Sequence, residues 1–451
     1  MKKTETWSTC FEDRCKRLCF ALVLLCLSCC ASVRSFAADT PPTPGEIWNL
    51  QELYETPSAT WGEVNEKTVK DETGKEVRVQ TQKVWYESGP WHGKKTRVMG
   101  FYSRPVGEAV YPGMILVHGG GGSAYSRWTE LWAARGYAAL AMDLAGCEIT
   151  SEESTEGDQP VVRLPDGGPN QISEFKFLNF SPDDQGYVES WTWQAVASIL
   201  RAHSLLDSLP EVDPNRTGIT GISWGGYLTS LVAGVDDRLQ VAVPVYGCGN
   251  LARLSVWTGA ELAKKTPEEV ALWTKYLDPI SYVGHARCRM LFVDGTDDFA
   301  YPLEINRDTW EQVPGADVCL ILHFPHSHGW GWTPPEIAAY VNSVLMPNCE
   351  TIPCLTNFRY EASVDGIVFR AENKYKVPLQ KTVLYYTTDP GGFGEDNKWQ
   401  VREWSTVDGE VQGDEITVQL PADVTARPVY VFLQAVDERG LRGSTHYLKI
   451  E

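Results

Sequence analysis

The sequence predicts an α/β fold, a mostly parallel sheet with helices on both faces, followed by a smaller all-β sandwich. In the middle of the chain, continuous apolar strand segments alternate with amphipathic helical segments, which is typical of a parallel sheet buried on both sides. Beyond residue 356 the strand segments become short and are separated by Gly, Pro and Asp turns. That second pattern is typical of a β-sandwich of the immunoglobulin or fibronectin kind.

Length and charge limit the classes of function. A chain of 451 residues has room for two or three domains, and its apolar fraction of 43% is that of a globular protein. The net charge is -19 and the Lys and Arg residues form no basic stripe. Because nucleic-acid binding depends on clustered basic residues, we expect no nucleic-acid partner.

Residues 1–37 have the pattern of a cleavable signal peptide. Basic residues precede an apolar run from Cys19 to Ala31, and small residues follow at the end of the segment. The run is too short to cross a bilayer and no later stretch is longer, so we expect no membrane span. The protein is therefore expected to be secreted or periplasmic. A lipoprotein anchor through Cys29 or Cys30 is less favoured because the flanking residues are unsuitable.

Six cysteines follow the predicted signal peptide: Cys147, Cys248, Cys288, Cys319, Cys349 and Cys354. Export permits disulfides, but the sequence leaves their pairing open. There are three suggestions. Cys349 and Cys354 could close a small loop, Cys288 and Cys319 could lie side by side, and Cys147 and Cys248 could form a disulfide or remain packed thiols. Since the spacing of Cys and His residues suggests no structural metal, we expect neither a metal nor a cofactor.

Residues 38–75 are polar and loosely patterned, and we expect them to form an extension that wraps the body. The predicted catalytic domain, residues 76–347, begins with an antiparallel pair of strands, Val77–Glu87 and Thr96–Ser103, joined by a turn.

Alternating strands and helices follow this pair. The expected parallel strands are Met114–Val117, Tyr137–Met142, Arg216–Thr220, Leu239–Val245, Met290–Val293 and Val318–Phe324. The expected helices are Ser126–Arg135, Ser190–Leu209, one starting near Tyr227, an insertion over Leu251–Leu277, and Pro334–Leu345. The long polar segment 148–187 is typical of functional or mobile loops, and whether it forms a lid stays open.

A linker at 348–356 leads to the predicted sandwich, residues 357–451. Its expected strands are Ile367–Phe369, Thr382–Thr387, Trp399–Trp404, Glu415–Leu420, Val429–Ala435 and Ser444–Ile450. This domain either contacts polysaccharide or simply packs on the catalytic domain.

The run Gly221-Ile-Ser223-Trp-Gly225-Gly lies between a strand and a helix. Small residues on either side of Ser223 permit a sharp turn that raises the hydroxyl above the edge of the sheet. A serine hydroxyl becomes nucleophilic when a base takes its proton and a third group orients that base. Ser223 is therefore the predicted nucleophile.

The partners of such a serine follow later strands of the same sheet. Asp294, Asp297 and Asp298 come after one strand, and His326 and His328 come after the last. Because the carboxyl ends of parallel strands meet at one edge, these side chains are expected to converge with Ser223.

The order Ser, Asp, His, the GISWGG elbow and the glycine run after His118 together resemble the α/β-hydrolase superfamily over residues 76–347. The similarity is greatest to its dienelactone hydrolase, acetyl xylan esterase and prolyl-oligopeptidase-like branch. In that branch the acid lies in a G-x-x-D-x-x-V-P pattern, which Gly295 to Pro302 matches except for Tyr301 in place of Val.

The resemblance implies a role for each residue of the site. Asp298 is the implied acid, with Asp294 and Asp297 less favoured. His328, which precedes a glycine, is the implied base, and His326 is the alternative base or a substrate contact. His118 is expected to hold its loop without taking part in the chemistry. The oxyanion donors are expected to be the amide of Trp224 and that of Gly120 or Gly121.

These residues predict a secreted serine hydrolase that cleaves carboxylic esters through an acyl-enzyme, with a small-molecule or carbohydrate ester, such as acetyl xylan, as substrate. A prolyl-oligopeptidase-like peptidase is the first alternative, although the residues before the first predicted strand are too few for the propeller that such relatives often carry. An inactive hydrolase scaffold used for binding is the second alternative.

Overall fold

We analysed a computed structural model that describes residues 41–71, 73–150, 160–171, 174, 180–422 and 429–450. The predicted signal peptide therefore lies outside the described residues. Within those residues, no helix combines the length and the apolar character that crossing a membrane requires.

The chain begins with a four-stranded antiparallel region. It consists of β1 (Ala59–Trp61), β2 (Asn65–Lys70), β3 (Glu76–Trp91) and β4 (Lys94–Pro105), after the short helices α2 (Pro44–Ile47) and α3 (Leu50–Leu53). The predicted β3–β4 hairpin is confirmed. The segment expected to form an extension that wraps the body contains β1 and β2, which both pair with β3. Most of β2 is exposed, which explains why its sequence lacks an apolar pattern.

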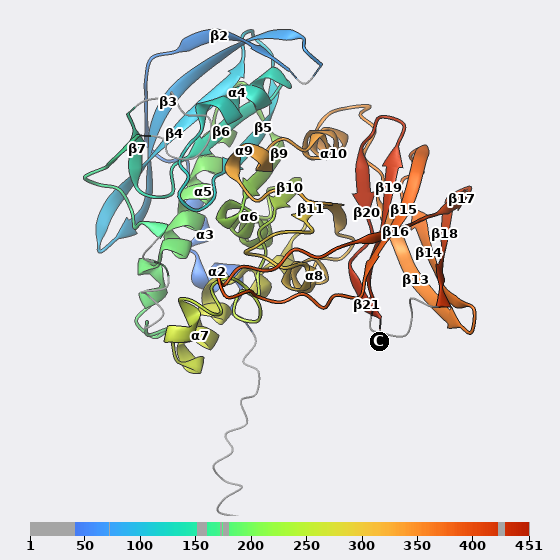
Figure 1. Ribbon diagram of the computed structural model, residues 1–451. Coiled ribbons are helices and arrows are strands. Elements are labelled where there is room, and N and C mark those ends of the chain that lie inside the picture. The colour runs from blue at the N-terminus through green and yellow to red at the C-terminus, as the bar shows by residue number, and fades with distance from the viewer. Residues whose placement is uncertain are drawn as a thin grey trace, which may run out of the picture. The chain divides into compact units, whose positions relative to one another are not determined.

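The central sheet continues from β4 in the order β6, β5, β9, β10, β11, β12. These strands are β6 (Ala138–Met142), β5 (Tyr111–Val117), β9 (Val212–Ile222), β10 (Val241–Val245), β11 (Arg289–Gly295) and β12 (Asp317–Ile321). All neighbours from β6 to β12 run parallel. This is the predicted α/β-hydrolase fold, and the order places the ends of β9, β11 and β12 along one edge (Figure 1).

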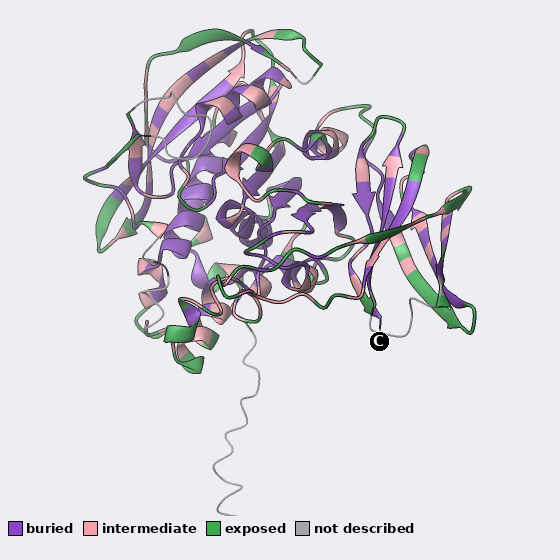
Figure 2. Ribbon diagram, in the orientation of Figure 1, coloured by how far each residue is buried: buried purple, intermediate pink, exposed green. Residues whose placement is uncertain are grey.

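Helices cover both faces of this sheet. They are α4 (Ser126–Ala134), α5 (Trp191–Asp207), α6 (Trp224–Val235), α7 (Pro267–Leu277), α8 (Leu303–Trp310), α9 (His328–Gly331) and α10 (Pro335–Leu345). The protein has one apolar core on each face of the sheet, and successive residues of β5 point into different cores. Ile115 packs with α5 and α6, and Leu116 packs with α4 and α10. Figure 2 shows that α5, α6 and the central strands are buried along nearly their whole length.

Short elements fill the connections. They are β7 (Cys147–Ile149), β8 (Val161–Arg163) and the 3-10 turns η2 (Gly186–Glu189), η3 (Leu262–Lys264), η4 (Pro279–Ser281) and η5 (Val283–His285). The expected helical insertion is helical mainly in α7, and helix α8, which follows Pro302, was not predicted. Parts of the polar segment 148–187 lie outside the described residues.

The β-rich C-terminal region forms two facing sheets. One contains β13 (Leu355–Ser363), β14 (Gly366–Asn373), β18 (Glu415–Pro421) and β17 (Glu410–Gln412); the other contains β20 (Arg442–Ser444), β19 (Val429–Asp437), β15 (Leu379–Thr387) and β16 (Ser405–Asp408), with β21 (Leu448–Ile450) beside β19. Side chains of β14, β15, β18 and β19 share one apolar core. A bridge between Val318 and Ser444 joins the second sheet to β12. The expected strand over 399–404 is wrong, because that segment is a loop.

The six described cysteines are free thiols, so none of the suggested disulfides is present among them. The parallel register explains why Cys288 and Cys319 are not bonded to each other. Cys319 lies opposite Val293, about five residues, or roughly 16 Å, along the strand direction from Cys288. At the junction, Cys349 is exposed whereas Cys354 is buried with its thiol directed at the Ile352 carbonyl.

Candidate active site

Ser223 lies at a strained turn between β9 and α6. Its backbone angles are φ 59° and ψ -118°, an unusual conformation for a residue with a side chain and one that occurs at functional turns. A side chain at Gly225 would run into the Val117 carbonyl, so glycine is required for α6 to begin this close to β5. The turn is held by hydrogen bonds from the Ser223 amide to the Val245 carbonyl (2.9 Å) and from the Tyr227 amide to the Ser223 carbonyl (2.9 Å).

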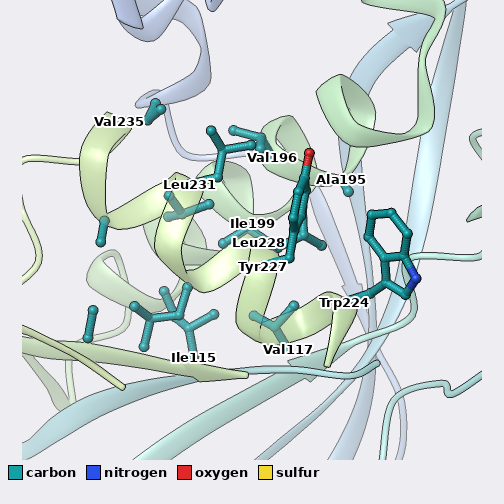
Figure 3. Packing of buried hydrophobic residues seen from close by; sticks show 14 of the residues in the cluster. Ile115, Val117, Ala195, Val196, Ile199, Trp224, Tyr227, Leu228, Leu231 and Val235 are labelled. Atoms are coloured by element: carbon teal, nitrogen blue, oxygen red, sulfur yellow. The ribbon is translucent and has the colours of Figure 1, made fainter. Parts of the chain in front are cut away.

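Helix α6 anchors this turn in the core. Leu228 and Leu231 pack against Val196 and Ile199 of α5, and Ile115 lies beneath them on the sheet (Figure 3). Every residue of α6 is buried. Burial of this kind resists movement of the helix, so the position of Ser223 is set by the core of the protein rather than by a surface loop.

The structure brings Ser223 and Asp298 together through His326. The His326 Nε2 atom lies 2.8 Å from Ser223 Oγ, and its Nδ1 atom lies 2.7 Å from Asp298 Oδ2. Asp298 is only 2% exposed, and its other oxygen accepts the amides of Ala300 and Tyr301, each at 2.8 Å. With one oxygen fixed by the backbone, the carboxylate presents the other to the imidazole.

Aromatic rings hold the His326 imidazole in place. Tyr246 stacks on it with ring centroids 4.4 Å apart, Tyr301 lies parallel to it at 6.0 Å, and Phe299 contacts it at 4.9 Å. Tyr301 is the residue that departs from the family pattern, and its ring occupies a place beside the imidazole. These contacts limit the ring to orientations that keep it between Ser223 and Asp298.

This geometry contradicts the expectation that His328 is the base. Ser327 caps α9, because its hydroxyl accepts the Trp330 amide, so His328 is already helical. In that position the His328 Nε2 atom accepts the Gly119 amide at 3.0 Å. His326 precedes the cap, outside any helix or strand, and reaches Ser223 instead.

His328 thus contacts the glycine loop rather than Ser223. Burial lowers the pKa of its imidazole, and the charge on a protonated His326 would lower it further. A neutral His328 keeps the lone pair that the Gly119 amide requires. The imidazole therefore links the last loop of the sheet to the loop that follows β5.

His118 holds the same glycine loop from its other side. Its Nε2 atom accepts the Leu144 amide at 2.9 Å, so its Nδ1 proton is donated to the Gly119 carbonyl at 2.7 Å. Burial lowers the pKa of His118 to about 4. Both nitrogen atoms are used in backbone contacts, which agrees with the structural role expected for this residue.

The candidate oxyanion donors lie beside Ser223. The Trp224 amide begins α6 directly after Ser223, and Gly120 is so close to the Trp224 ring that a Cβ atom there would approach it to 2.9 Å. Since the Gly119 amide is donated to His328, the glycine-loop amides that remain as candidates are those of Gly120 and Gly121.

The two alternative acids have other surroundings. Asp297 contacts the exposed His323, with 2.5 Å between Oδ2 and Nδ1. Asp294 is buried at the end of β11, where burial and the neighbouring Asp298 raise the pKa of its carboxyl well above the ordinary value. Neither is the carboxylate that contacts His326.

Aromatic side chains pack next to Ser223. Trp224 contacts Trp257 with ring centroids 4.8 Å apart, and Trp257 contacts Tyr301 at 5.1 Å. Of the two tryptophans that follow His328, Trp332 packs against Tyr125 and Trp128, whereas Trp330 is 56% exposed. Trp257 was not noted from the sequence, because it lies in an irregular segment without a motif.

Chemically, this arrangement provides what acyl transfer requires: a hydroxyl, a base within reach of it, a carboxylate that orients the base, and backbone amides near the attacking oxygen. Within the described ranges, no group of three or more His, Cys, Asp or Glu side chains is placed to hold a metal ion.

Comparisons with known proteins agree with this fold. The sequence model of the prolyl oligopeptidase family matches residues 189–306, which contain the serine turn and the Asp298 loop. Over residues 189–306 this match agrees with the resemblance to the prolyl-oligopeptidase-like branch.

Two curated relatives match parts of the chain. One is the uncharacterized peptidase YuxL of Bacillus subtilis, 25% identical over 282 residues, which are 58% of this chain and 36% of the relative. The other is the quorum-quenching protein AidA of Acinetobacter baumannii, 30% identical over 143 residues, which are 31% of this chain and 36% of the relative. The chain thus spans about a third of the length of these relatives.

Solved structures with a similar fold include an acetyl xylan esterase from Paenibacillus sp. R4, with a TM-score of 0.46 and 22% identity over 64% of this chain and 92% of the other. They also include an acylaminoacyl peptidase from Pyrococcus horikoshii, with a TM-score of 0.37 and 16% identity over 55% of this chain and 43% of the other.

Proposed function

We propose that this protein is a serine hydrolase that cleaves carboxylic esters through an acyl-enzyme. The observation that carries the proposal is the position of His326, with one ring nitrogen 2.8 Å from Ser223 Oγ and the other 2.7 Å from Asp298. A binding scaffold has no need of this arrangement, so we favour an active enzyme over an inactive one.

In the proposed reaction, His326 Nε2 takes the proton of Ser223 as Oγ attacks the ester carbonyl. The negative charge that develops on the carbonyl oxygen is stabilised by the amide of Trp224 and that of Gly120 or Gly121. His326 then gives its proton to the departing alcohol, and the acyl group stays on Ser223. Water, activated by the same imidazole, releases the acid and restores the serine.

We propose a short acyl group, such as acetyl, on a carbohydrate alcohol. Trp224, the residue after Ser223, contacts Trp257, and Trp257 contacts Tyr301. Apolar rings of this kind suit a small acyl group. The carbohydrate part of the proposal is supported by the predicted export of the protein. We propose the secreted or periplasmic location on the pattern of residues 1–37, and the N-terminus of the mature protein, determined by mass spectrometry, tests it.

A peptidase of the prolyl oligopeptidase kind is the second candidate. It is favoured by the match of that family over residues 189–306. The same side chains would cleave an amide, so the candidates differ in the substrate and not in the catalytic groups.

Parallel assays separate the two candidates. The value of kcat/KM is measured for p-nitrophenyl acetate, acetylated xylan and a prolyl peptide amide, with Ser223→Ala as the control for each. We expect acetate release from the two esters and a loss of about 10⁴-fold or more in the control. A preference for the peptide amide would support the peptidase, and equal rates for wild type and control would exclude both.

A further inference from the structure

A loop of the C-terminal region contacts the loop that carries Asp298. Residues 389–404 leave β15, run toward α8 and return to β16 (Figure 1). At the tip of this segment, the Trp399 amide donates to the Phe299 carbonyl at 3.0 Å. Phe299 is the residue after Asp298, and its ring contacts His326. The contact therefore lies one residue away from the candidate acid.

Three successive carbonyls of the acid loop have identifiable donors. The Phe299 carbonyl accepts the Trp399 amide, the Ala300 carbonyl accepts the Val256 amide at 3.2 Å, and the Tyr301 carbonyl accepts Nδ2 of Asn306 at 2.9 Å. The loop around Asp298 is thus fixed by donors from outside it, and the donor nearest to Asp298 belongs to the C-terminal region.

A second contact from the same loop supports the Ala300 carbonyl indirectly. The Asn397 side chain donates Nδ2 to the Val256 carbonyl at 2.6 Å, and the Val256 amide is the donor to Ala300. Asn397 has a φ of 57°, a left-handed conformation that also suits glycine. Two of the three carbonyls therefore depend on residues 397–399.

The base of the loop is anchored by a buried ion pair. Arg402, 1% exposed, donates to Glu304 in the first turn of α8 at 2.6 Å and to the Tyr447 hydroxyl at 2.7 Å. Its guanidinium also lies 5.2 Å from the Trp399 ring. Since a buried charge pair with further hydrogen bonds is costly to separate, the loop is held at a defined position relative to α8.

We propose that residues 389–404 are a positioning element for Asp298, and that the C-terminal region is part of the catalytic unit rather than an independent polysaccharide-binding module. The loop supports the backbone directly after the acid and thereby keeps the carboxylate at bonding distance from His326. This inference rests on the proposed function, because it assigns the loop a role in the reaction of Ser223.

The first test compares two variants of the C-terminal region. Asn397→Gly removes the amide while allowing the same backbone conformation, and Val364→Ala changes a 92% exposed residue of the C-terminal region outside the loop. We expect Asn397→Gly to lower kcat about two- to tenfold with KM nearly unchanged, as for the loss of one hydrogen bond. Val364→Ala should match the wild type. The concentration of active sites is titrated with a fluorophosphonate, so that partial unfolding does not count as lost turnover.

A second variant replaces residues 394–398 by two glycines, which displaces Trp399 as well. We expect a loss of about 10²-fold in kcat per titrated site, comparable to that caused by a small displacement of a catalytic group. The loss should be the same on p-nitrophenyl acetate and on acetylated xylan, because it originates at Asp298.

The substrate comparison decides the question. A loss confined to acetylated xylan would identify the loop as a polymer-binding element, and unchanged kcat on both substrates would deny it any role; either result overturns the inference. If the wild type itself neither reacts with the fluorophosphonate nor releases acetate, the proposed function fails instead.

Discussion

The imidazole of His328 accepts the amide proton of Gly119 at 3.0 Å, and so connects the loop after β12 to the glycine loop after β5. Two residues earlier, His326 contacts Ser223. The His-Ser-His run therefore serves two parts of one site: its first imidazole contacts Ser223, and its second holds the loop that carries the candidate oxyanion donors.

We predict that His328→Ala lowers kcat about tenfold, because the glycine loop loses the acceptor that orients it. His328→Gln should recover part of the activity, since its side-chain oxygen can accept the Gly119 amide. Steady-state kinetics on p-nitrophenyl acetate check both values. A loss in His328→Ala as large as that in Ser223→Ala would show that His328 has a direct chemical role.

Asp298→Asn should lower kcat by about 10⁴-fold with a small change in KM, because the amide no longer holds the imidazole in the tautomer that accepts the serine proton. Asp297→Asn is the matched control. Asp297 contacts His323 and not His326, so we expect less than about a twofold effect on kcat. Similar losses in the two variants would contradict the assignment of Asp298.

The buried His118 makes stability depend on pH. Its pKa is about 4 in the folded protein and 6.5 ordinarily, so the unfolded chain binds this proton at a pH where the folded protein does not. The contribution of His118 to the free energy of unfolding is therefore complete above pH 6.5. It decreases by up to about 3 kcal/mol as the pH falls to 4.

His118→Gln, whose side chain keeps an acceptor for the Leu144 amide but does not titrate, should lack this part of the pH dependence. Urea unfolding at pH 7 and at pH 5 measures it. The decrease in unfolding free energy between the two pH values should be smaller in the variant than in the wild type, and an equal decrease would refute the prediction.

Much of the site was predictable because its positions depend on local backbone chemistry. The turn at Ser223 requires small residues on both sides, and the glycine loop requires amides without side chains in front of them. Asp298 follows a buried strand. Each of these leaves a signal within a few residues of sequence.

The choice between His326 and His328 left no such signal. It depends on the five-residue distance from the end of β12 and on the capping of α9 by Ser327, which turns His328 toward Gly119. The two histidines are only two residues apart, and only His328 lies in the short helix α9. That difference arises from tertiary structure rather than from residue type.

The C-terminal region illustrates a second limit. The tryptophans at 399 and 404 suggested a strand, but the backbone at 399 bonds to Phe299 of the catalytic region instead of a neighbouring strand. Such a contact joins residues a hundred positions apart. Local polarity patterns contain no information about it, so the role of residues 389–404 emerges only from the structure.

The most direct test of the account compares His326→Ala with His328→Ala in one assay. The rate of covalent labelling of Ser223 by a fluorophosphonate is measured together with kcat/KM for p-nitrophenyl acetate. We predict a loss of about 10⁴-fold or more in His326→Ala and about tenfold in His328→Ala. The reverse order, or labelling of His326→Ala at the wild-type rate, would contradict the claim that His326 activates Ser223.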